Sequence, residues 1–457
     1  MTRLTDDADV AAIDHTYRYL QPSVLEPART GSHLRLATST GSEEHPHFFD
    51  GRLTEPRRTG QLLRSLANLV GTRFFTPPNM VERLIRQADP VVTAGGGIVR
   101  FEVFSECCST YARVDLTADA YEAEHLSPGT TNVDFNAPMR AALSSLRDDD
   151  DVGLSVGSEG LTLRTRDADV VEKRVALPLR WIRGFVEVQG YQAALAPRLT
   201  LDGRAAFRLL RSLPRQASKH PTWIVPAGRG ARTSQRRSDA GVRVSGTERL
   251  RSLEPLCVKA DQLQIFGGPD AGASLWELDF GMARITLLLS AEVWRGFSGE
   301  GQALARLVRA EPAAIAAVRA RLAWQSQLEV DELAKATDLD EGRVRDALAA
   351  LGARGLVGFD ANIGSYFHRE LPFDLSAVEA LQPRLVAARE LVASIDPTTD
   401  RRGVERVVRV PGSGATHRVV IGPDGERCSC TWFSRTQGAR GPCKHVLAAQ
   451  IATEGAS

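Results

Sequence analysis

The fold at the end of this chain is decided by the stretch CSCTWFSRTQGARGPCKH, residues 428–445. Two cysteines stand one residue apart, and after twelve further residues a Cys-Lys-His triplet adds a third cysteine and a histidine. A redox thiol pair does not require Cys-x-His at this distance, whereas thiolates with an imidazole suit a tetrahedral zinc ion. An iron–sulfur cluster is less favoured, because a fourth cysteine is absent from the stretch. We therefore expect Cys428, Cys430, Cys443 and His445 to bind one zinc ion.

The neighbouring residues predict a small sheet followed by a helix. Two valine-rich runs, 406–410 and 417–421, flank PGSGAT and read as a β-hairpin. In an extended strand residues i and i+2 face the same side, so Cys428 and Cys430 can meet one ion. His445 is expected in the first turn of a helix through VLAAQIA. A site closed by four protein ligands leaves no position for water, which indicates structural rather than catalytic zinc.

The composition is that of an ordinary globular protein, with 457 residues of which 43% are apolar. The net charge of +1 creates no overall field toward nucleic acid or membrane, so binding to either requires a local patch. We find no apolar run long enough for a membrane span and no signal peptide at the N-terminus. The six cysteines do not form a disulfide framework. We expect a cytoplasmic protein without membrane contact.

The chain is expected to be an α+β multidomain protein. Residues 1–90 are predicted to be mostly helical, from leucines at helical spacing in TGQLLRSLANLVGTRFF. Residues 91–198 and 199–304 are predicted to be two copies of one α+β unit, forming a duplicated scaffold. In both, a strand, a helix, a second strand and a β-like run ending in Arg-Gly-Phe follow each other; these last runs are 177–185 and 289–297.

Residues 305–372 are predicted to form a winged helix-turn-helix, followed by a helical linker, 373–400, and a ββα zinc finger, 401–457. Three periodic segments with Asp340 as a helix N-cap precede a hairpin, which is the order of that fold. The exposed side of the third helix mixes both charges, and this favours packing or protein contact over nucleic acid. Those residues are Glu341, Arg343, Arg345, Asp346 and Arg354.

Two charged stretches have open interpretations. The arginine-rich segment 226–241 is read as a mobile surface loop, with a basic arm for phosphate or acidic partners as the alternative. The four aspartates of 148–151 are read as a solvated turn, since converging ligands for a metal are not visible.

No catalytic motif is found, and we predict that the protein is not an enzyme. Glu106, Cys107 and Cys108 could hold a nucleophile but are read as buried structure. His45-Pro46-His47 could be half of a metal site but is read as a loop. Cationic and aromatic residues occur together at the two repeat ends. Packing between cation and ring is the favoured role for them, and a binding surface is the alternative. They are Arg180, Trp181, Arg183, Trp294 and Arg295.

Cys-x-Cys, twelve residues and Cys-x-His within a strand–strand–helix frame resemble the SWIM zinc finger, whose ligands would be the four residues named above. Further stretches resemble an uncharacterised bacterial family of SWIM finger proteins, most familiar from actinobacteria. They are FFDGRLTEPRR, VVTAGGGIVRFEVFSECCSTYARVDL, GTTNVDF, RWIRGF, WRGFSGEG, YFHRELP and RGPCKHVLAA. The resemblance implies a DNA-binding or protein-interaction module, often encoded beside MoxR-type AAA+ ATPases and von Willebrand factor A proteins. It brings no catalytic residue.

We therefore expect a non-enzymatic zinc-binding adaptor that contacts a protein partner, such as an AAA+ ATPase, and has no small-molecule substrate. The alternative is a DNA- or RNA-binding regulatory, repair or defence protein. A third reading is an enzyme that uses the first 300 residues.

Overall fold

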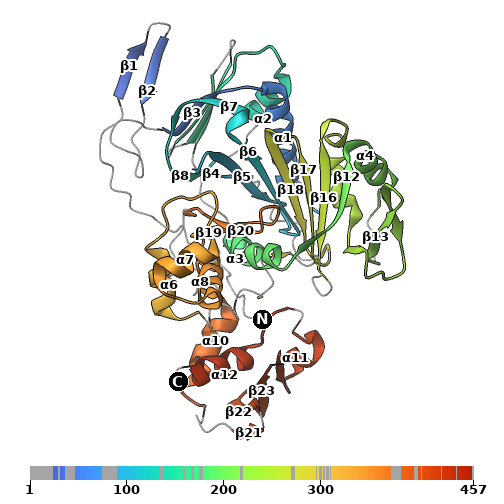
Figure 1. The fold of residues 1–457 in the computed structure, drawn as a ribbon, viewed down its shortest axis with the longest axis vertical. Coiled ribbons are helices and arrows are strands. Elements are labelled where there is room, and N and C mark those ends of the chain that lie inside the picture. The colour runs from blue at the N-terminus through green and yellow to red at the C-terminus, as the bar shows by residue number, and fades with distance from the viewer. Residues whose placement is uncertain are drawn as a thin grey trace, which may run out of the picture.

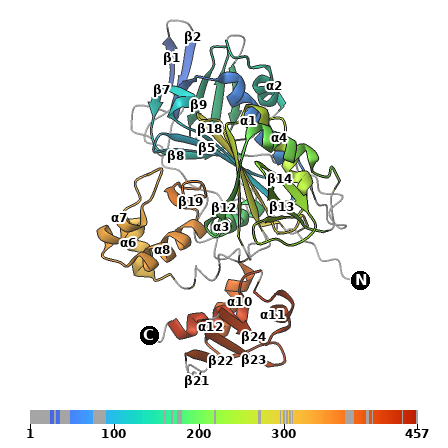
Figure 2. The same cartoon turned by 45° about the vertical axis from the view of Figure 1, so that its right-hand side comes forward.

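Figure 1 shows the computed structural model, which describes residues 24–28, 31–35, 47–74, 90–371 and 382–454, the last two ranges with short gaps. A β-rich scaffold carries a helical unit on one side, and the body that contains the zinc finger lies beyond both (Figures 1 and 2). Across the described residues, no helix has the length and apolar character needed to cross a membrane.

The scaffold is organised around an eight-stranded sheet of order β12-β16-β17-β18-β6-β5-β4-β8. The antiparallel pair β18–β6, with Ile285 opposite Val114, joins strands from the two predicted repeat segments into this single sheet. The strands are β4 (Val91–Gly95), β5 (Ile98–Phe104), β6 (Thr110–Leu116), β8 (Gly129–Asn132), β12 (Ala196–Asp202), β16 (Gln262–Gly267), β17 (Ser274–Asp279) and β18 (Ala283–Leu289).

A second sheet of order β11-β10-β9-β3-β7 lies beside the first. Its strands are β3 (His47–Leu53), β7 (Tyr121–Leu126), β9 (Gly153–Gly157), β10 (Gly160–Arg164) and β11 (Asp169–Lys173). Helix α1 (Pro56–Val70) starts with proline, whose fixed φ suits a first helical turn, and buries its leucines against α2 (Ala137–Ser145), β5 and β6.

The described part of residues 1–90 is not mostly helical, contrary to the prediction. It holds α1 but also β3 and a two-stranded hairpin, β1 (Val24–Ala28) and β2 (Gly31–Arg35). In β3 both Phe48 and Phe49 are buried, so the strand lacks the strict alternation by which a half-buried strand is recognised.

The β-like run predicted at residues 177–185 is also wrong, because Leu179–Ala193 is helix α3. Trp181, Ile182 and Phe185 recur at helical spacing and are buried. At the matching end, β18 finishes at Leu289 and the described residues that follow form no further strand of this sheet. The two endings that supported the repeat therefore differ in structure.

The segment 226–241, read as a loop, contributes to a compact unit instead. A three-stranded sheet of order β14-β13-β15 packs beside helix α4 (Gly203–Ser212). Asp202 caps α4 by accepting a hydrogen bond from the backbone N–H of Ala205 at 2.7 Å. The strands are β13 (Thr222–Ala227), β14 (Gly230–Ser234) and β15 (Val242–Val244), and the 3₁₀ segments η2 (Thr247–Leu253) and η3 (Cys257–Lys259) follow.

The helical unit contains the three helices and the hairpin predicted for it: α6 (Pro312–Arg319), α7 (Val330–Thr337), α8 (Glu341–Ala353), β19 (Val357–Asp360) and β20 (Ser365–His368). Asp340 caps α8, accepting from the backbone N–H of Arg343 at 3.0 Å. The second half of α8 is buried, and the helix packs on α3 of the scaffold.

The last body combines a four-stranded sheet with three helices. Helix α10 (Pro383–Val392) packs on α12 (Lys444–Glu454), and its Leu385 and Ala388 share one apolar core with Val410 and Leu447. Within the segment predicted as a linker, α10 is thus part of the finger body. The other elements are β21 (Asp400–Arg402), β22 (Glu405–Pro411), β23 (Thr416–Gly422), β24 (Gly425–Cys428) and the short helix α11 (Thr431–Thr436).

Candidate metal centre

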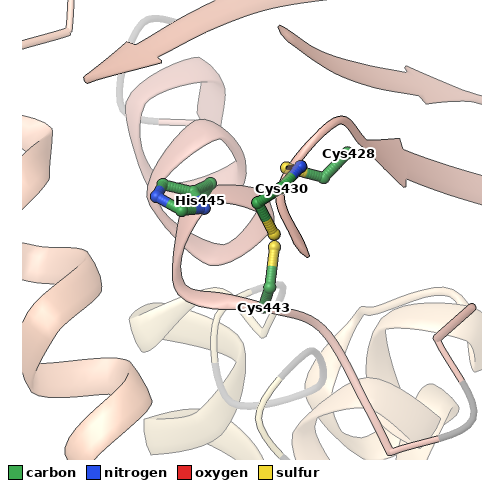
Figure 3. Close-up of side chains that lie close together, drawn as sticks. All are labelled: Cys428, Cys430, Cys443 and His445. Atoms are coloured by element: carbon green, nitrogen blue, oxygen red, sulfur yellow. Dashed lines mark hydrogen bonds between the residues drawn. The ribbon is translucent and has the colours of Figure 1, made fainter. Parts of the chain in front are cut away.

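Three elements bring the predicted ligand residues together (Figure 3). Cys428 ends β24, Cys430 is the N-cap of α11, Cys443 directly precedes α12, and His445 is in the first turn of α12. The three sulfur atoms and a ring nitrogen of the histidine all lie within 4.8 Å of one another.

Extended backbone at the first two cysteines explains how they face one point. Ser429 is tied to β23, since its N–H donates to the Arg418 carbonyl at 3.1 Å and its hydroxyl accepts from the Arg418 N–H at 3.0 Å. Cys430 keeps an extended conformation, with φ −75° and ψ 153°. The side chains of Cys428 and Cys430 therefore lie on the side opposite to Ser429.

The chemistry of this cluster fits a bound cation. The four residues are only 2–7% exposed. Within the described residues, neither ring nitrogen of His445 has a hydrogen-bond partner outside this cluster. Buried polar atoms normally have a bonding partner. A metal ion bound by the imidazole and the three sulfur atoms would supply that partner. Three sulfur ligands and one nitrogen in a closed set fit one structural zinc ion.

Backbone N–H groups already point at two of the sulfur atoms. The Phe433 N–H donates to Cys430 Sγ at 3.3 Å, and the Cys430 N–H donates to Cys428 Sγ at 3.5 Å. A hydrogen bond from Cys428 lowers the pKa of Cys443 to about 4, whereas the pKa of Cys428 is raised by that same bond and by burial. Burial likewise raises the pKa of Cys430. Without a cation the thiols share protons; a divalent ion removes these protons on binding.

Arg384 of α10 holds the loop that carries Cys443. Its Nη1 donates to the carbonyls of Arg440 at 2.8 Å and Pro442 at 3.2 Å, and its guanidinium lies 4.9 Å from the Trp432 ring centroid. Arg384 belongs to no sequence motif, and it lies 59 positions before Cys443 in the chain, so spacing alone could not identify it.

Among the described residues, the other side chains considered from sequence do not converge on a second centre. Glu106 forms an ion pair with Arg73, and Cys108 is buried. Cys107 Sγ lies 3.2 Å from the Ser109 hydroxyl in the same tight turn. His45 lies outside the described residues, and His47 begins β3.

The aromatic residues of the two predicted repeat ends also differ. Trp181 is fully buried and packs on Phe104 at 5.7 Å between ring centroids, whereas Trp294 is 55% exposed and Arg295 lies outside the described residues. The aspartate run forms an exposed turn whose Asp148 and Asp151 make salt bridges with arginines.

A cluster of eight buried charged residues, which sequence reasoning missed, joins the scaffold to the helical unit. Asp360 of β19 accepts from Arg284 Nη2 at 2.8 Å and lies 3.2 Å from Arg113 Nη2. Arg113 Nη1 also donates to the carbonyl of Phe359 at 2.9 Å. The members are Arg100, Glu102, Arg113, Asp115, Glu277, Arg284, Asp360 and Arg369, all less than 9% exposed.

Two carboxyl groups of this charged cluster have displaced pKa values. Burial raises the pKa of Glu277 to about 7, an effect that Arg284 only partly offsets. Burial also disfavours the ionised form of Asp360, yet Arg113 and Arg284 outweigh it and bring its pKa to about 2. Asp360 thus ties the helical unit to the sheet, while Glu277 of β17 contacts Arg284 and Thr286 within the sheet itself.

Comparisons with known proteins identify the finger. The sequence pattern of the SWIM zinc finger family matches residues 417–453, so the chain contains a SWIM zinc finger domain. The comparison with curated proteins found no match.

Solved structures are similar to about half of the chain. Proliferating Cellular Nuclear Antigen from Entamoeba histolytica has 12% identity and a TM-score of 0.39, over 53% of this chain and 98% of that chain. A. fulgidus PCNA bound to the C-terminal region of FEN-1 has 12% identity and a TM-score of 0.37, over 53% and 97%. Likeness at this level carries no conclusion about fold or function.

Proposed function

We propose that this chain is a non-enzymatic adaptor whose SWIM finger, closed around one zinc ion by Cys428, Cys430, Cys443 and His445, binds a protein partner. The burial of all four side chains supports a structural role for the metal, since little room is left for a reacting water or substrate. On this proposal the zinc shapes a binding surface and takes no part in chemistry.

A groove on the finger body is the observation that carries the proposal. It has a volume of about 440 Å³ and lies between the β22–β24 sheet and α12. Val404, Ile421 and Pro423 give it apolar walls, and Val404 is 79% exposed. Arg406 and Glu426 bring opposite charges to its lining. An apolar groove of mixed charge suits a peptide segment of a protein better than a phosphate backbone.

The helical unit also favours contact with protein over contact with DNA. Its helix–helix–helix–hairpin order is that of a winged helix, the fold we propose for it. The exposed cations of α8 are neutralised, because Arg343 pairs with Glu311 and Arg345 pairs with Glu341. With half of α8 buried as well, the unit is suited to docking on the scaffold and not to entering a DNA groove.

The identity of the partner rests on the sequence resemblance alone. It suggests a cytoplasmic bacterial protein that works with a MoxR-type AAA+ ATPase and a von Willebrand factor A protein. The alternative of a nucleic-acid-binding regulatory protein draws no support from α8. The alternative of an enzyme that uses the scaffold is not supported by Glu106 or Cys108. Glu106 forms an ion pair with Arg73, and Cys108 is buried.

The test is direct binding of the zinc-loaded full chain to a purified MoxR-type ATPase, measured by calorimetry. Val404→Glu should abolish binding, because it places a charge in the apolar wall of the groove. Ile363→Glu, at a 40% exposed apolar position in the β19–β20 turn of the helical unit, is the control outside the groove and should bind normally. Undiminished binding by the Val404 variant would exclude the groove as the contact.

A further inference from the structure

A single segment concentrates the positive charge of the chain. Residues 202–244 hold nine arginines, one lysine and two aspartates, a net charge of +8, although the whole chain carries +1. The remaining residues therefore carry −7. In the fold this segment is α4 together with β13, β14 and β15, the unit at the edge of the scaffold away from the helical unit and the finger body (Figures 1 and 2).

Helix α4 sorts its residues by face. Arg204, Arg208 and Arg211 recur at spacings of four and three and are exposed. The intervening Ala205 and Leu209 are buried against the scaffold, along with Ala206 and Leu210. Packing therefore fixes the helix with a row of guanidinium groups directed at solvent.

The β13–β14 hairpin brings a second set of arginines to the same place. Arg229 lies in its turn, Arg232 on β14, and Arg236 and Arg237 follow the strand; all four are exposed. Helix α4 packs on β14, and a groove of about 390 Å³ between them is lined by Arg208 from the helix and Arg232 from the strand. The hydroxyl-bearing Ser212 and Thr233 line the same groove.

Among the described residues, only one of these exposed arginines has a carboxylate partner. Arg211 lies 3.7 Å from Glu254 in a salt bridge with the arginine side chain 65% exposed. Among the described residues, no salt bridge involves the other exposed arginines of this unit, which are Arg204, Arg208, Arg215, Arg229, Arg232, Arg236 and Arg237. This unit differs in that respect from α8, whose exposed arginines are paired.

We propose that α4 and the β13–β14 hairpin form a surface that binds the phosphate backbone of duplex DNA without reading its sequence. Guanidinium groups are bidentate donors to phosphate, and phosphate contacts supply affinity without sequence information. The proposal concerns a different surface from the finger groove and does not depend on the function proposed for the finger.

Other polyanions fit the surface less well. Within the described residues, α4, β13 and β14 have no large apolar side chain among those that are strongly exposed. Stacking of single-stranded bases, insertion into a membrane and anchoring of a protein all call for such side chains. Val258 of η3, which packs on α4, is 61% exposed but aliphatic, so it cannot stack on a base. Specific binding of RNA relies on contacts to 2′-hydroxyl groups and to unstacked bases. A row of guanidinium groups does not distinguish these features from a phosphate backbone.

The test measures binding of the zinc-loaded full chain to labelled duplex DNA of mixed sequence between about 50 and 200 mM salt, by fluorescence anisotropy. The variant Arg204→Gln/Arg208→Gln/Arg229→Gln/Arg232→Gln should weaken binding and flatten the slope of log K against log salt. The flattening is about 0.9 for each phosphate contact removed, so up to about 3.6 for four. The same four positions changed to lysine should retain most of the slope.

A matched control removes four exposed but paired arginines elsewhere. Arg52, Arg343, Arg345 and Arg427 each form a salt bridge, so their glutamine variant loses the same charge and should keep most of the DNA affinity. Cys428→Ser/Cys430→Ser should also bind DNA normally. An unchanged slope in the α4–hairpin variant would overturn the proposal. Equal loss in the control, loss in the cysteine variant, or preferential binding of anionic vesicles, acidic peptide or RNA would overturn it as well.

Discussion

Arg369 and Glu102 form an ion pair that is fully buried at the junction of the helical unit and the scaffold, although 267 positions separate them in the chain. Tyr111 completes the arrangement by donating its hydroxyl to Glu102 at 2.6 Å. A carboxylate in this position has no access to water, so its stability in the fold depends on the guanidinium. The pair therefore links the docking of the helical unit to the stability of the sheet.

Replacing one member of this ion pair should destabilise the protein strongly, whereas replacing both should destabilise it much less. Arg369→Met leaves Glu102 buried without its ion-pair partner, which we expect to destabilise the protein by about 3–5 kcal/mol. Glu102→Gln/Arg369→Met should recover most of that loss, since two neutral side chains require no compensation. Urea unfolding of the single and double variants measures both. Additive losses would show that the two residues do not act as a pair.

Glu277 should make the stability of the scaffold fall as pH rises. Burial raises its pKa in the folded chain to about 7, above the ordinary value of 4.5. Between these two values the folded state binds more protons than the unfolded chain, so this contribution is full below about pH 4.5 and is lost as pH rises through 7.

Glu277→Gln should remove this dependence and leave the protein more stable at pH 8 by up to about 3 kcal/mol, since each unit of displaced pKa is worth about 1.36 kcal/mol. The amide can still accept from Thr286, which donates to Glu277 at 2.7 Å. Denaturation at pH 5 and pH 8 separates the outcomes, and the variant should match the parent chain at the lower pH. A variant that loses stability equally at both values would contradict the assignment.

Zinc removal should unfold the finger body and leave the scaffold folded. Structural zinc supplies about 10–16 kcal/mol of apparent folding free energy, and the finger body has its own apolar core, separate from that of the scaffold. Hydrogen exchange after treatment with a chelator should accelerate in residues 405–454 and stay slow in β5, β6 and β18. Restoring zinc should restore protection. Equal exchange with and without metal would refute a structural role.

Short-range features were predictable from the sequence, and contacts between distant segments were not. The metal cluster could be predicted because its ligands lie within 18 residues of chain. The N-cap of α8 could be predicted because Asp340 caps the helix that directly follows it. The buried charged cluster was missed for a physical reason. Arg100 and Glu102 alternate with apolar residues in β5, a pattern that normally indicates a solvent-facing side, but here β19 and β20 cover it.

Arg384 is the clearest case of a residue that only the fold reveals, and it leads to the last prediction. Because its guanidinium holds the carbonyls of Arg440 and Pro442, it positions the loop that leads directly into Cys443. Arg384→Ala should weaken zinc binding by about 10- to 100-fold, the usual effect of losing a residue that orients a ligand. Competition with a chromophoric chelator measures the affinity. Arg389→Ala, an exposed position on the same helix, is the control and should bind zinc normally. If Arg384→Ala binds zinc as tightly as the parent chain, the loop before Cys443 is positioned by the finger sheet and α12 alone, and α10 contributes only packing.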